Sequence, residues 1–330
     1  MKKLSIGVIG TGHLGSLHTK IYSKMESVNL VGVFDVDTAK AEQIAALYGT
    51  KSFKGLEQLL DKIEAASIVT STKAHFDVAN RAIERGIHTL IEKPITETID
   101  QAQSLVRQAD EKRVVLQVGH IERFNPAILA LDQYRVKPLF IESHRLAQFN
   151  PRGSDVAVVL DLMIHDIDLI LSLVRSPVKR IDANGVAVVS DSIDIANARL
   201  QFESGCVANV TASRISQNKM RKMRLFQQDA YISIDFSQGT SEVFRLVDEG
   251  DPGLKPTLML GEIERGTKKR LIVYEQPEVK EVNSLEYELG LFVDAVQNNH
   301  EPAVTGRDGL QALEVAQQIL KTIESQVLKF

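Results

Sequence analysis

The sequence has little cysteine: Cys206 is the only one among 330 residues. An intramolecular disulfide is therefore excluded, and so is a zinc site built mainly from cysteines. The sequence also lacks an apolar run long enough to span a membrane. The apolar residues near the start are interrupted by glycines and lack a small-residue cleavage pattern, so we do not predict a signal peptide. We expect a soluble cytoplasmic protein.

Basic clusters are missing as well. The formal net charge is −4, and no long block of Lys and Arg occurs, which argues against nucleic acid or a membrane surface as the main partner. The length is that of two domains, or of one domain with a large appendage.

A glycine-rich motif follows the first predicted strand, Leu4–Ile9, and has the G-x-G-x-x-G spacing of a dinucleotide-binding turn. In such a turn Gly10 permits the tight bend and Gly12 lets a pyrophosphate approach the backbone. Gly15 lets the next helix pack closely on the strand. The candidate cofactor-binding residues of this motif are Gly10, Thr11, Gly12, His13, Leu14 and Gly15.

An acidic residue, Asp35, ends the next predicted strand, Val28–Phe34. It lies about twenty residues beyond the last glycine, where the fingerprint places the group that binds the adenosine ribose. Val36 and Asp37 come next, with no arginine to receive a 2′-phosphate. The sequence therefore predicts a Rossmann domain that binds NAD rather than NADP.

A third predicted strand, 66–69, ends in Thr70, Ser71 and Thr72, near the expected path of the cofactor. These hydroxyl groups and His75 are candidate cofactor ligands. Alternatively, the hydroxyl groups cap a helix predicted at 74–85.

The next predicted strand, 88–91, runs into Glu92, Lys93 and Pro94. Sheets of this kind bind ligands at the carboxyl ends of their strands, and Pro94 keeps Lys93 out of helical geometry. We predict that Lys93 projects over the sheet edge, with Glu92 positioning Lys93 or the cofactor. The alternative is a solvated surface lysine.

The pattern changes after residue 122, where strand-like runs follow one another with few helices between them. This favours a largely antiparallel or mixed open sheet, and a second copy of the chain could cover its free face. We predict an α/β fold with an NAD-binding Rossmann domain over 1–122 and a substrate-binding and oligomerisation domain over 123–330. The last helix, 308–330 with Asp308 as its N-cap, packs back on the first domain. The strands predicted in the second domain are 139–146, 180–189, 196–202, 206–214, 222–227, 231–236, 242–247 and 270–274.

Three polar residues recur at helical spacing in the apolar segment 160–170. On a helix Asp161, His165 and Asp168 form one stripe, because they are spaced i, i+4 and i+7. A buried helix with such a stripe needs a polar group to face, and Lys93 would complete a Lys/Asp/His site. The alternative is a histidine satisfied by a neighbouring carboxylate.

These motifs resemble the glucose–fructose oxidoreductase, inositol dehydrogenase and rhizopine-catabolism (Gfo/Idh/MocA) family. The resemblance rests on the glycine motif, on Glu92-Lys93-Pro94 and on Asp161-x-x-x-His165, and it covers essentially the whole chain. It implies a Rossmann domain, a mixed-sheet substrate and oligomerisation domain, and a Lys/Asp/His site without metal.

A narrower resemblance is carried by residues 117–126, 159–168 and 212–214. They are similar to the branch of the family that oxidises the 3-hydroxyl of UDP-N-acetylglucosamine. The resemblance implies a sugar-nucleotide substrate. It also implies coupling to an aminotransferase, because the oxidation precedes transamination to the 2,3-diamino sugar of certain lipid A molecules.

Oxidation of a secondary alcohol requires removal of the hydroxyl proton. His165 is the first candidate for the base, because the unperturbed pKa of an imidazole is near neutrality. Asp161 would orient the ring and Lys93 would stabilise the developing alkoxide. A lysine with a depressed pKa is the alternative base.

Several arginines are candidates for binding the substrate. Arg123 could steady an anionic group or pair with a nearby carboxylate. Arg214, Arg221 and Arg224 are candidates for a pyrophosphate; alternatively they are exposed strand-edge charges that discourage aggregation.

Two other functions fit the same fold. One is a dehydrogenase of another sugar, a polyol or a tetrapyrrole-like acceptor, and the other is an NAD-sensing regulatory protein without catalysis. The complete set of Lys93, Asp161 and His165 argues against the tetrapyrrole and the sensor.

Overall fold

A computed structural model of the chain describes residues 2–150, 156–248, 258–265 and 268–327. The chain divides into two compact units. Unit 1 comprises Met1–Ile121 and Asn283–Glu314, and unit 2 comprises Glu122–Val282 and Val315–Phe330. The predicted second domain, 123–330, therefore differs from unit 2 by the segment 283–314, which belongs to unit 1, and by Glu122, which belongs to unit 2.

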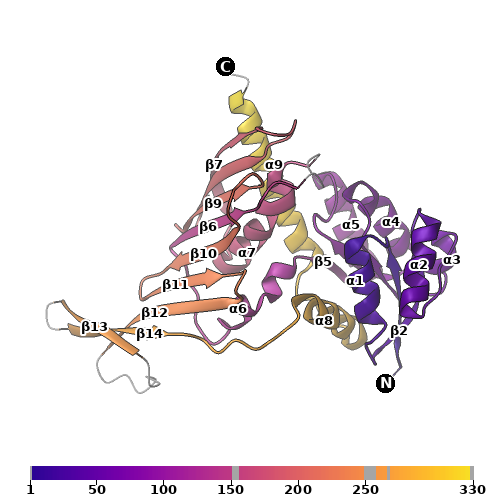
Figure 1. Cartoon of the computed structure of the whole chain (residues 1–330), viewed down its shortest axis with the longest axis horizontal. Helices are drawn as coiled ribbons and strands as arrows, with labels where there is room; N and C mark the ends of the chain where they lie inside the picture. The colour runs from indigo at the N-terminus through magenta and orange to yellow at the C-terminus, as the bar shows by residue number, and fades with distance from the viewer. Residues whose placement is uncertain (1, 151–155, 249–257, 266–267, 328–330) are drawn as a thin grey trace. The chain divides into compact units, whose positions relative to one another are not determined.

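Unit 1 is built on a parallel sheet flanked by helices (Figure 1). The sheet has five strands in the order β2-β1-β3-β4-β5. Its strands are apolar because helices cover both faces of the sheet. The strands are β1 Leu4–Ile9, β2 Val28–Phe34, β3 Ala65–Ile68, β4 His88–Glu92 and β5 Leu116–Gly119. The helices are α1 His13–Tyr22, α2 Thr38–Tyr48, α3 Leu56–Leu60, α4 Thr72–Glu84, α5 Ile99–Lys112 and α8 Ser284–Asn298. This architecture confirms the predicted Rossmann domain.

The segment that returns to unit 1 from late in the sequence is held by apolar packing. Leu285, Leu289 and Phe292 of α8 are buried in one cluster with Ile6 and Val8 of β1. Burying one such side chain is worth about 1.5–3 kcal/mol, so the cluster fixes α8 on the sheet face that also carries α1. Local sequence patterns do not reveal such a long-range return.

The last helix, α9 Gly306–Val327, begins two residues before the predicted start. Thr305 precedes it, and its hydroxyl accepts a hydrogen bond from the Asp308 amide at 3.1 Å. The Asp308 carboxylate in turn accepts one from the Thr305 amide at 2.8 Å. Thr305 is thus the N-cap and Asp308 its reciprocal partner, as in a capping box. The predicted N-cap at Asp308 is wrong.

Unit 2 is built on a mixed sheet of nine described strands, in the order β13-β14-β12-β11-β10-β6-β9-β8-β7. The pairing of β6 with β9 is parallel and the other pairings are antiparallel. The strands are β6 Phe140–Leu146, β7 Val178–Val186, β8 Ile195–Phe202, β9 Val207–Ser213, β10 Met220–Phe226, β11 Ala230–Asp235, β12 Thr240–Asp248, β13 Leu258–Arg265 and β14 Lys268–Glu275. The predicted fold class is confirmed.

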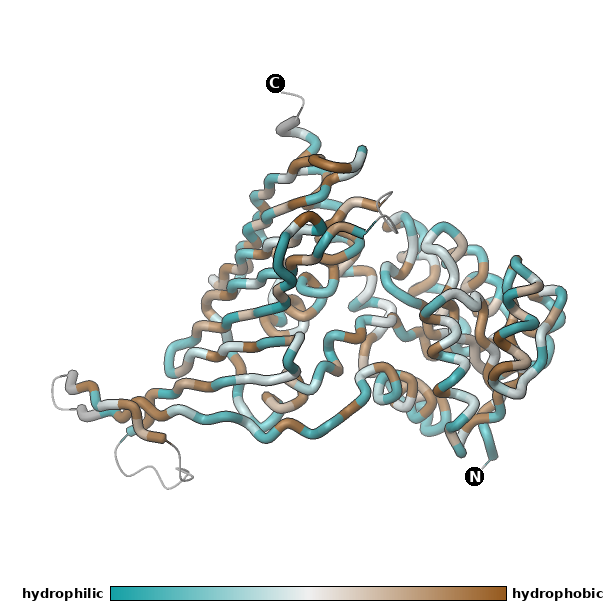
Figure 2. The backbone as a smooth tube through the Cα atoms, in the orientation of Figure 1, coloured by the Kyte–Doolittle hydropathy of each residue, from teal (hydrophilic) through white to brown (hydrophobic). Residues whose placement is uncertain are grey.

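One face of this sheet is buried under helices. It packs against the π-helical turn η2 Val159–Met163, against α6 Pro126–Leu129 and α7 Ile164–Val174, and against the second part of α9. The strands alternate between hydrophobic and hydrophilic residues (Figure 2), as expected of a sheet with one covered face. The other face carries polar residues and a row of aromatic rings.

The strand β13 is absent from the sequence-based prediction. Leu258, Met259 and Leu260 are consecutive, and all three are exposed. The ladder with β14 shifts register between Met259 and Gly261. Period-2 alternation therefore does not occur here, and alternation is the signal by which a half-buried strand is found.

No described helix is both long and apolar enough to cross a membrane.

Candidate active site

The turn between β1 and α1 admits only glycine at two positions. Gly10 has a φ of +95°, and a Cβ atom there would lie 2.5 Å from the carbonyl oxygen of Val69. A Cβ atom at Gly15 would collide with the carbonyl oxygen of Gly10. A Cβ atom at Gly12 would instead meet open space among the described atoms, and no side chain caps α1. The first-turn amides of α1 thus remain available to a phosphate.

Asp35 is held as an ionised acceptor just after β2. Its carboxylate accepts hydrogen bonds from the amide of Thr11 at 2.6 Å, from the Thr11 hydroxyl at 2.9 Å and from the amide of Asp37 at 3.0 Å. Burial raises the pKa of Asp35, but these bonds and nearby Lys40 lower it overall. A fixed carboxylate at this strand end suits ribose hydroxyls. Together with the open glycine turn, it makes the residues fit NAD.

Several other predicted cofactor ligands near this edge are at least partly exposed. His13 and Leu14 are exposed at the start of α1. Ser71 is the N-cap of α4, but its side chain makes no capping hydrogen bond. Thr70 and Thr72 are partly exposed. The alternative in which these hydroxyls cap the helix is therefore not supported, and α4 begins at Thr72 rather than at residue 74.

His75 is buried and joins two loops at the sheet edge. Its Nδ1 atom lies 2.9 Å from the carbonyl oxygen of Pro94, and its Nε2 atom lies 3.2 Å from that of Thr70. Burial lowers the pKa of His75, against the opposing effect of these two carbonyls. Because both ring nitrogens face backbone oxygens, His75 positions the loops that follow β3 and β4.

Lys93 follows β4, is partly exposed and is linked to Pro94 by a cis peptide bond. Glu92, directly before it, is buried, and its Oε1 atom lies 3.2 Å from Nε2 of His18. Burial raises the pKa of Glu92, but the close contact with His18 and the nearby charge of Lys93 lower it overall. Lys93 therefore stands beside a buried, ionised carboxylate.

His18 was missed by the reasoning from sequence. Its signal was available, because Gly15, His18, Thr19 and Tyr22 recur at helical spacing and all four are buried. A polar residue on the buried face of the helix that follows the glycine turn has to find a partner.

Asp161 and His165 lie at the junction of two kinds of helix in unit 2. Asp161 is in the π-helical turn η2, and His165 is in the first turn of α7. The prediction of a regular α-helix through this segment is wrong at Asp161. π-helical turns occur frequently at functional sites. Both side chains are partly exposed, as a substrate-binding pair requires.

Asp168 does not join this pair. Its carboxylate accepts two hydrogen bonds from Arg123, at 2.8 Å and 2.6 Å, and only 1% of the residue is exposed. The predicted stripe of three polar residues is therefore wrong at its third member. Arg123 is engaged in a bidentate pair that anchors α7.

A second ion-pair cluster also holds α7. Arg145 of β6 donates two hydrogen bonds of 2.9 Å to Asp166 and one of 3.1 Å to Glu122. Glu122 also accepts a hydrogen bond from Arg221. Asp166 and Asp168, on either side of Ile167, thus tie the helix that carries His165 to β6 and to the 3₁₀ helix η1 Ile121–Phe124.

The remaining candidate arginines are not strand-edge charges. Arg214 and Arg224 lie at and within the interior strands β9 and β10. Arg214 is buried and donates to the carbonyl oxygen of Val156. Arg224 is exposed and lies 3.5 Å from Glu142. The strands β9 and β10 are each paired with a neighbouring strand on both sides. Neither arginine therefore lies on an edge strand, and the edge-charge alternative is wrong.

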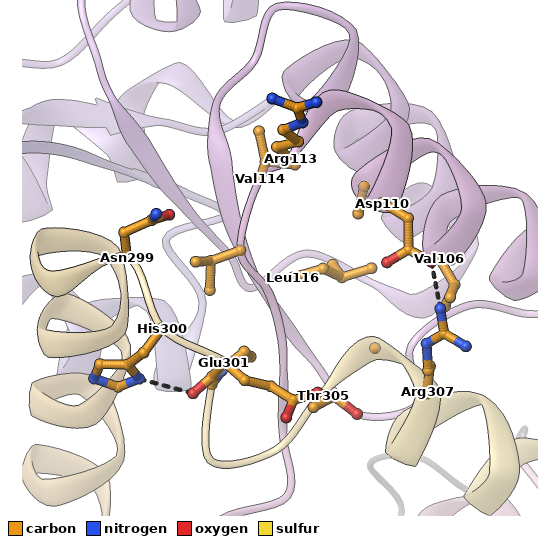
Figure 3. Close-up of a pocket in the computed structure, with 14 residues that line it drawn as sticks. Val106, Asp110, Arg113, Val114, Leu116, Asn299, His300, Glu301, Thr305 and Arg307 are labelled. Atoms are coloured by element: carbon orange, nitrogen blue, oxygen red, sulfur yellow. Dashed lines mark hydrogen bonds and ion pairs between the residues drawn. The ribbon is translucent and has the colours of Figure 1, made fainter.

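A pocket of about 300 Å³ lies elsewhere in unit 1, at the amino end of β5 (Figure 3). It is lined by Leu116 and by an ion pair between Arg307 and Asp110. The glycine turn follows the carboxyl end of β1, so this pocket is at the other edge of the parallel sheet. It is separate from the predicted cofactor site.

Comparison with known families gives two matches. A model described as "Oxidoreductase family, NAD-binding Rossmann fold" matches residues 4–120. A model described as "GFO/IDH/MocA C-terminal domain" matches residues 129–241.

The chain is also similar to individual proteins. It is 36% identical over 326 residues to UDP-N-acetylglucosamine 3-dehydrogenase of Acidithiobacillus ferrooxidans, which covers 98% of this chain and 99% of the relative. A solved structure of that enzyme superposes with a TM-score of 0.88 at the same coverage. The chain is 28% identical over 228 residues to scyllo-inositol 2-dehydrogenase (NAD(+)) of Bacillus subtilis, with 63% of this chain and 67% of the relative covered.

Proposed function

Since the chain belongs to the Gfo/Idh/MocA family of oxidoreductases with an NAD-binding Rossmann fold, we propose that it oxidises the 3-hydroxyl of UDP-N-acetylglucosamine to the 3-keto sugar. The observation that carries the proposal is the 36% identity to a UDP-N-acetylglucosamine 3-dehydrogenase over 98% of the chain. The open glycine turn and the fixed Asp35 support NAD as the cofactor.

We assign the chemistry to three residues. NAD, when bound, supplies a hydride acceptor. His165 takes the hydroxyl proton, Asp161 orients its imidazole, and the ammonium of Lys93 stabilises the oxygen as negative charge develops on it. The alternative is that Lys93 takes the proton and His165 donates a hydrogen bond to the oxygen. Arg123 and Arg214 act indirectly in this proposal, because their guanidinium groups contact Asp168 and the Val156 carbonyl.

The test is formation of NADH absorbance when the purified protein is mixed with NAD and UDP-N-acetylglucosamine. An aminotransferase and glutamate should be present, because we further propose that an aminotransferase consumes the keto product on the way to the diamino sugar of lipid A. We expect turnover with this sugar nucleotide and little with free N-acetylglucosamine or myo-inositol. Turnover only with a free polyol would refute the proposed substrate and keep the dehydrogenase.

We also propose that a second copy covers the free face of the sheet in unit 2. Five aromatic rings form a continuous row across β6, β10, β11, β12 and β14, with adjacent centroids 5.0–5.9 Å apart. These rings are Phe140, Phe226, Tyr231, Phe244 and Tyr274. Aromatic residues are enriched at the cores of protein interfaces.

Sedimentation velocity tests this interface. We expect an oligomer for the unmodified chain and a smaller species for Phe226→Glu, because Phe226, the second ring of the row, is 37% exposed and burying a carboxylate there in an interface would cost free energy. Val36→Glu is the control, since Val36 is 91% exposed in unit 1. An unmodified chain that sediments as a monomer at micromolar concentration would refute the proposal.

A further inference from the structure

A chain of buried polar groups leads from the middle of the Rossmann sheet to Lys93. Ser67 is on β3, and its hydroxyl oxygen lies 2.7 Å from Nδ1 of His18. Nε2 of His18 lies 3.2 Å from the carboxylate of Glu92, the residue before Lys93. Both Ser67 and His18 are fully buried. The chain therefore links a strand interior to the residue beside the proposed catalytic lysine.

Nε2 of His18 faces the Glu92 carboxylate at 3.2 Å, but the two groups are not aligned as a hydrogen bond. An ionised carboxylate only accepts hydrogen bonds, so a proton on Nε2 is the one that can be shared with Glu92. When Nε2 carries the single proton of the ring, Nδ1 is an acceptor and the Ser67 hydroxyl can donate to it. Ser67 is thus compatible with the tautomer of His18 that serves Glu92.

Glu92 also lies against the backbone of β5. It pairs in register with Gly119, and a Cβ atom at Gly119 would lie 3.1 Å from the carboxyl carbon and from both carboxyl oxygens of Glu92. Such a contact is tighter than ordinary van der Waals contact. The glycine at 119 therefore leaves the space that the Glu92 carboxylate occupies next to His18.

Burying polar groups costs free energy unless they are hydrogen-bonded. Apolar residues of similar size would avoid that cost at position 18, on the buried side of α1, and at position 67, in a strand whose other residues are apolar. Among the described residues, the contacts of Ser67 and His18 instead lead to the carboxylate of Glu92, the residue before Lys93. The charged or titratable groups facing Glu92 are His18 and Tyr22 from α1, Lys93 after β4 and His75 from α4.

We propose that His18 is a positioning residue of the dehydrogenase, which keeps Glu92 ionised and fixed so that its negative charge helps to hold the ammonium of the adjacent Lys93 in place. The proposal rests on the proposed function only in giving Lys93 a catalytic role. The arrangement of Ser67, His18 and Glu92 is independent of the identity of the substrate.

The first test needs no substrate. The titration of Glu92 can be followed by carbon NMR of the full-length protein labelled at the glutamate carboxyl carbon, with the signal assigned by its loss in Glu92→Gln. His18→Leu removes the donor and leaves burial, which raises the pKa of Glu92. We expect the titration midpoint to rise by about 1–3 pH units, as for the loss of an opposite or hydrogen-bonded partner.

The second test uses activity. In His18→Leu the pKa of Glu92 is expected to lie closer to neutrality, so more of Glu92 is protonated at pH 6 than at pH 9. This variant should therefore lower kcat about tenfold at pH 6 and much less at pH 9. The KM for NAD should change little. His18→Gln carries an amide that can donate to Glu92 but cannot titrate, so it should restore most of the midpoint and of kcat.

Thr19→Val is the matched control. Thr19 is the next residue, is equally buried and bonds only within its helix, through its hydroxyl to the carbonyl oxygen of Gly15, among the described contacts. It should leave the titration of Glu92 and the pH profile unchanged. If His18→Leu does not fold, Ser67→Ala replaces it, with a smaller shift expected in the same direction.

The outcomes separate the two proposals. A Glu92 midpoint that is unchanged in His18→Leu, or that His18→Gln fails to restore, would refute the positioning role even if the enzyme turns over. If the unmodified protein is silent on every sugar nucleotide but the Glu92 midpoint still rises in His18→Leu, the proposed function is refuted. The positioning of Glu92 by His18 then stands.

Discussion

Lys93→Ala should lower kcat by about 10²–10⁴-fold with UDP-N-acetylglucosamine, the range expected for removal of a group that stabilises a developing oxyanion or transfers its proton. The affinity for NAD should change little, because the groups proposed to hold the cofactor are the glycine turn and Asp35. Stopped-flow measurement of NADH formation, with NAD affinity measured separately by calorimetry, checks both expectations.

Lys112→Ala is the control, since Lys112 is an exposed lysine at the end of α5 in the same unit. It should behave as the unmodified enzyme. Lys93→Arg keeps the charge but not the compact ammonium, and its kcat should remain well below that of the unmodified enzyme. If Lys93→Ala retained more than a tenth of the original kcat, Lys93 would have no catalytic role.

The pH profile separates the two candidate bases. If His165 takes the proton, kcat of the unmodified enzyme falls as the pH drops through the range in which a histidine titrates, and His165→Gln loses that limb along with most of its activity. If Lys93 takes the proton, His165→Gln keeps the limb and Lys93→Arg loses it. Each variant therefore tests independently which of the two residues accepts the proton.

Much of unit 1 could be predicted from sequence because its signals are local. The spacing of Gly10, Gly12 and Gly15 and the position of Asp35 at a strand end each depend on backbone constraints within a few residues. The structure gives these residues the local geometry that the fingerprint requires. Lys93 at the end of β4 was predicted for the same reason.

What was missed depends on contacts between distant residues. His18 meets Glu92 across 74 positions of sequence, and the return of α8 to unit 1 joins residues nearly as far apart as the chain allows. Asp168 was placed on a functional stripe because helical spacing shows which residues share a face. Spacing does not show that Arg123 already occupies that face.

Substitution of Arg145, in its buried ion-pair cluster, should have the largest effect on the free energy of unfolding. Only 5% of its side chain is exposed, and it carries bonds to both Asp166 and Glu122. Arg145→Met leaves Asp166 buried without its partner, and breaking such a pair typically costs 3–5 kcal/mol. We expect a loss of about that size in the free energy of unfolding of unit 2. Because the chain has no tryptophan, urea denaturation should be followed by circular dichroism.

The double variant Arg145→Met/Asp166→Leu shows whether the cost comes from the stranded charge. Removing both partners replaces an ion pair with apolar side chains, which is often neutral or stabilising, and Glu122 still has Arg221. Most of the lost stability should therefore return. Arg180→Ala is the control, because Arg180 pairs with Asp182 at an exposed site, where ion pairs contribute little to stability. If Arg145→Met cost no more than this control, or if the double variant were less stable than the single one, the cluster would not anchor α7, and His165 would depend on other contacts for its position.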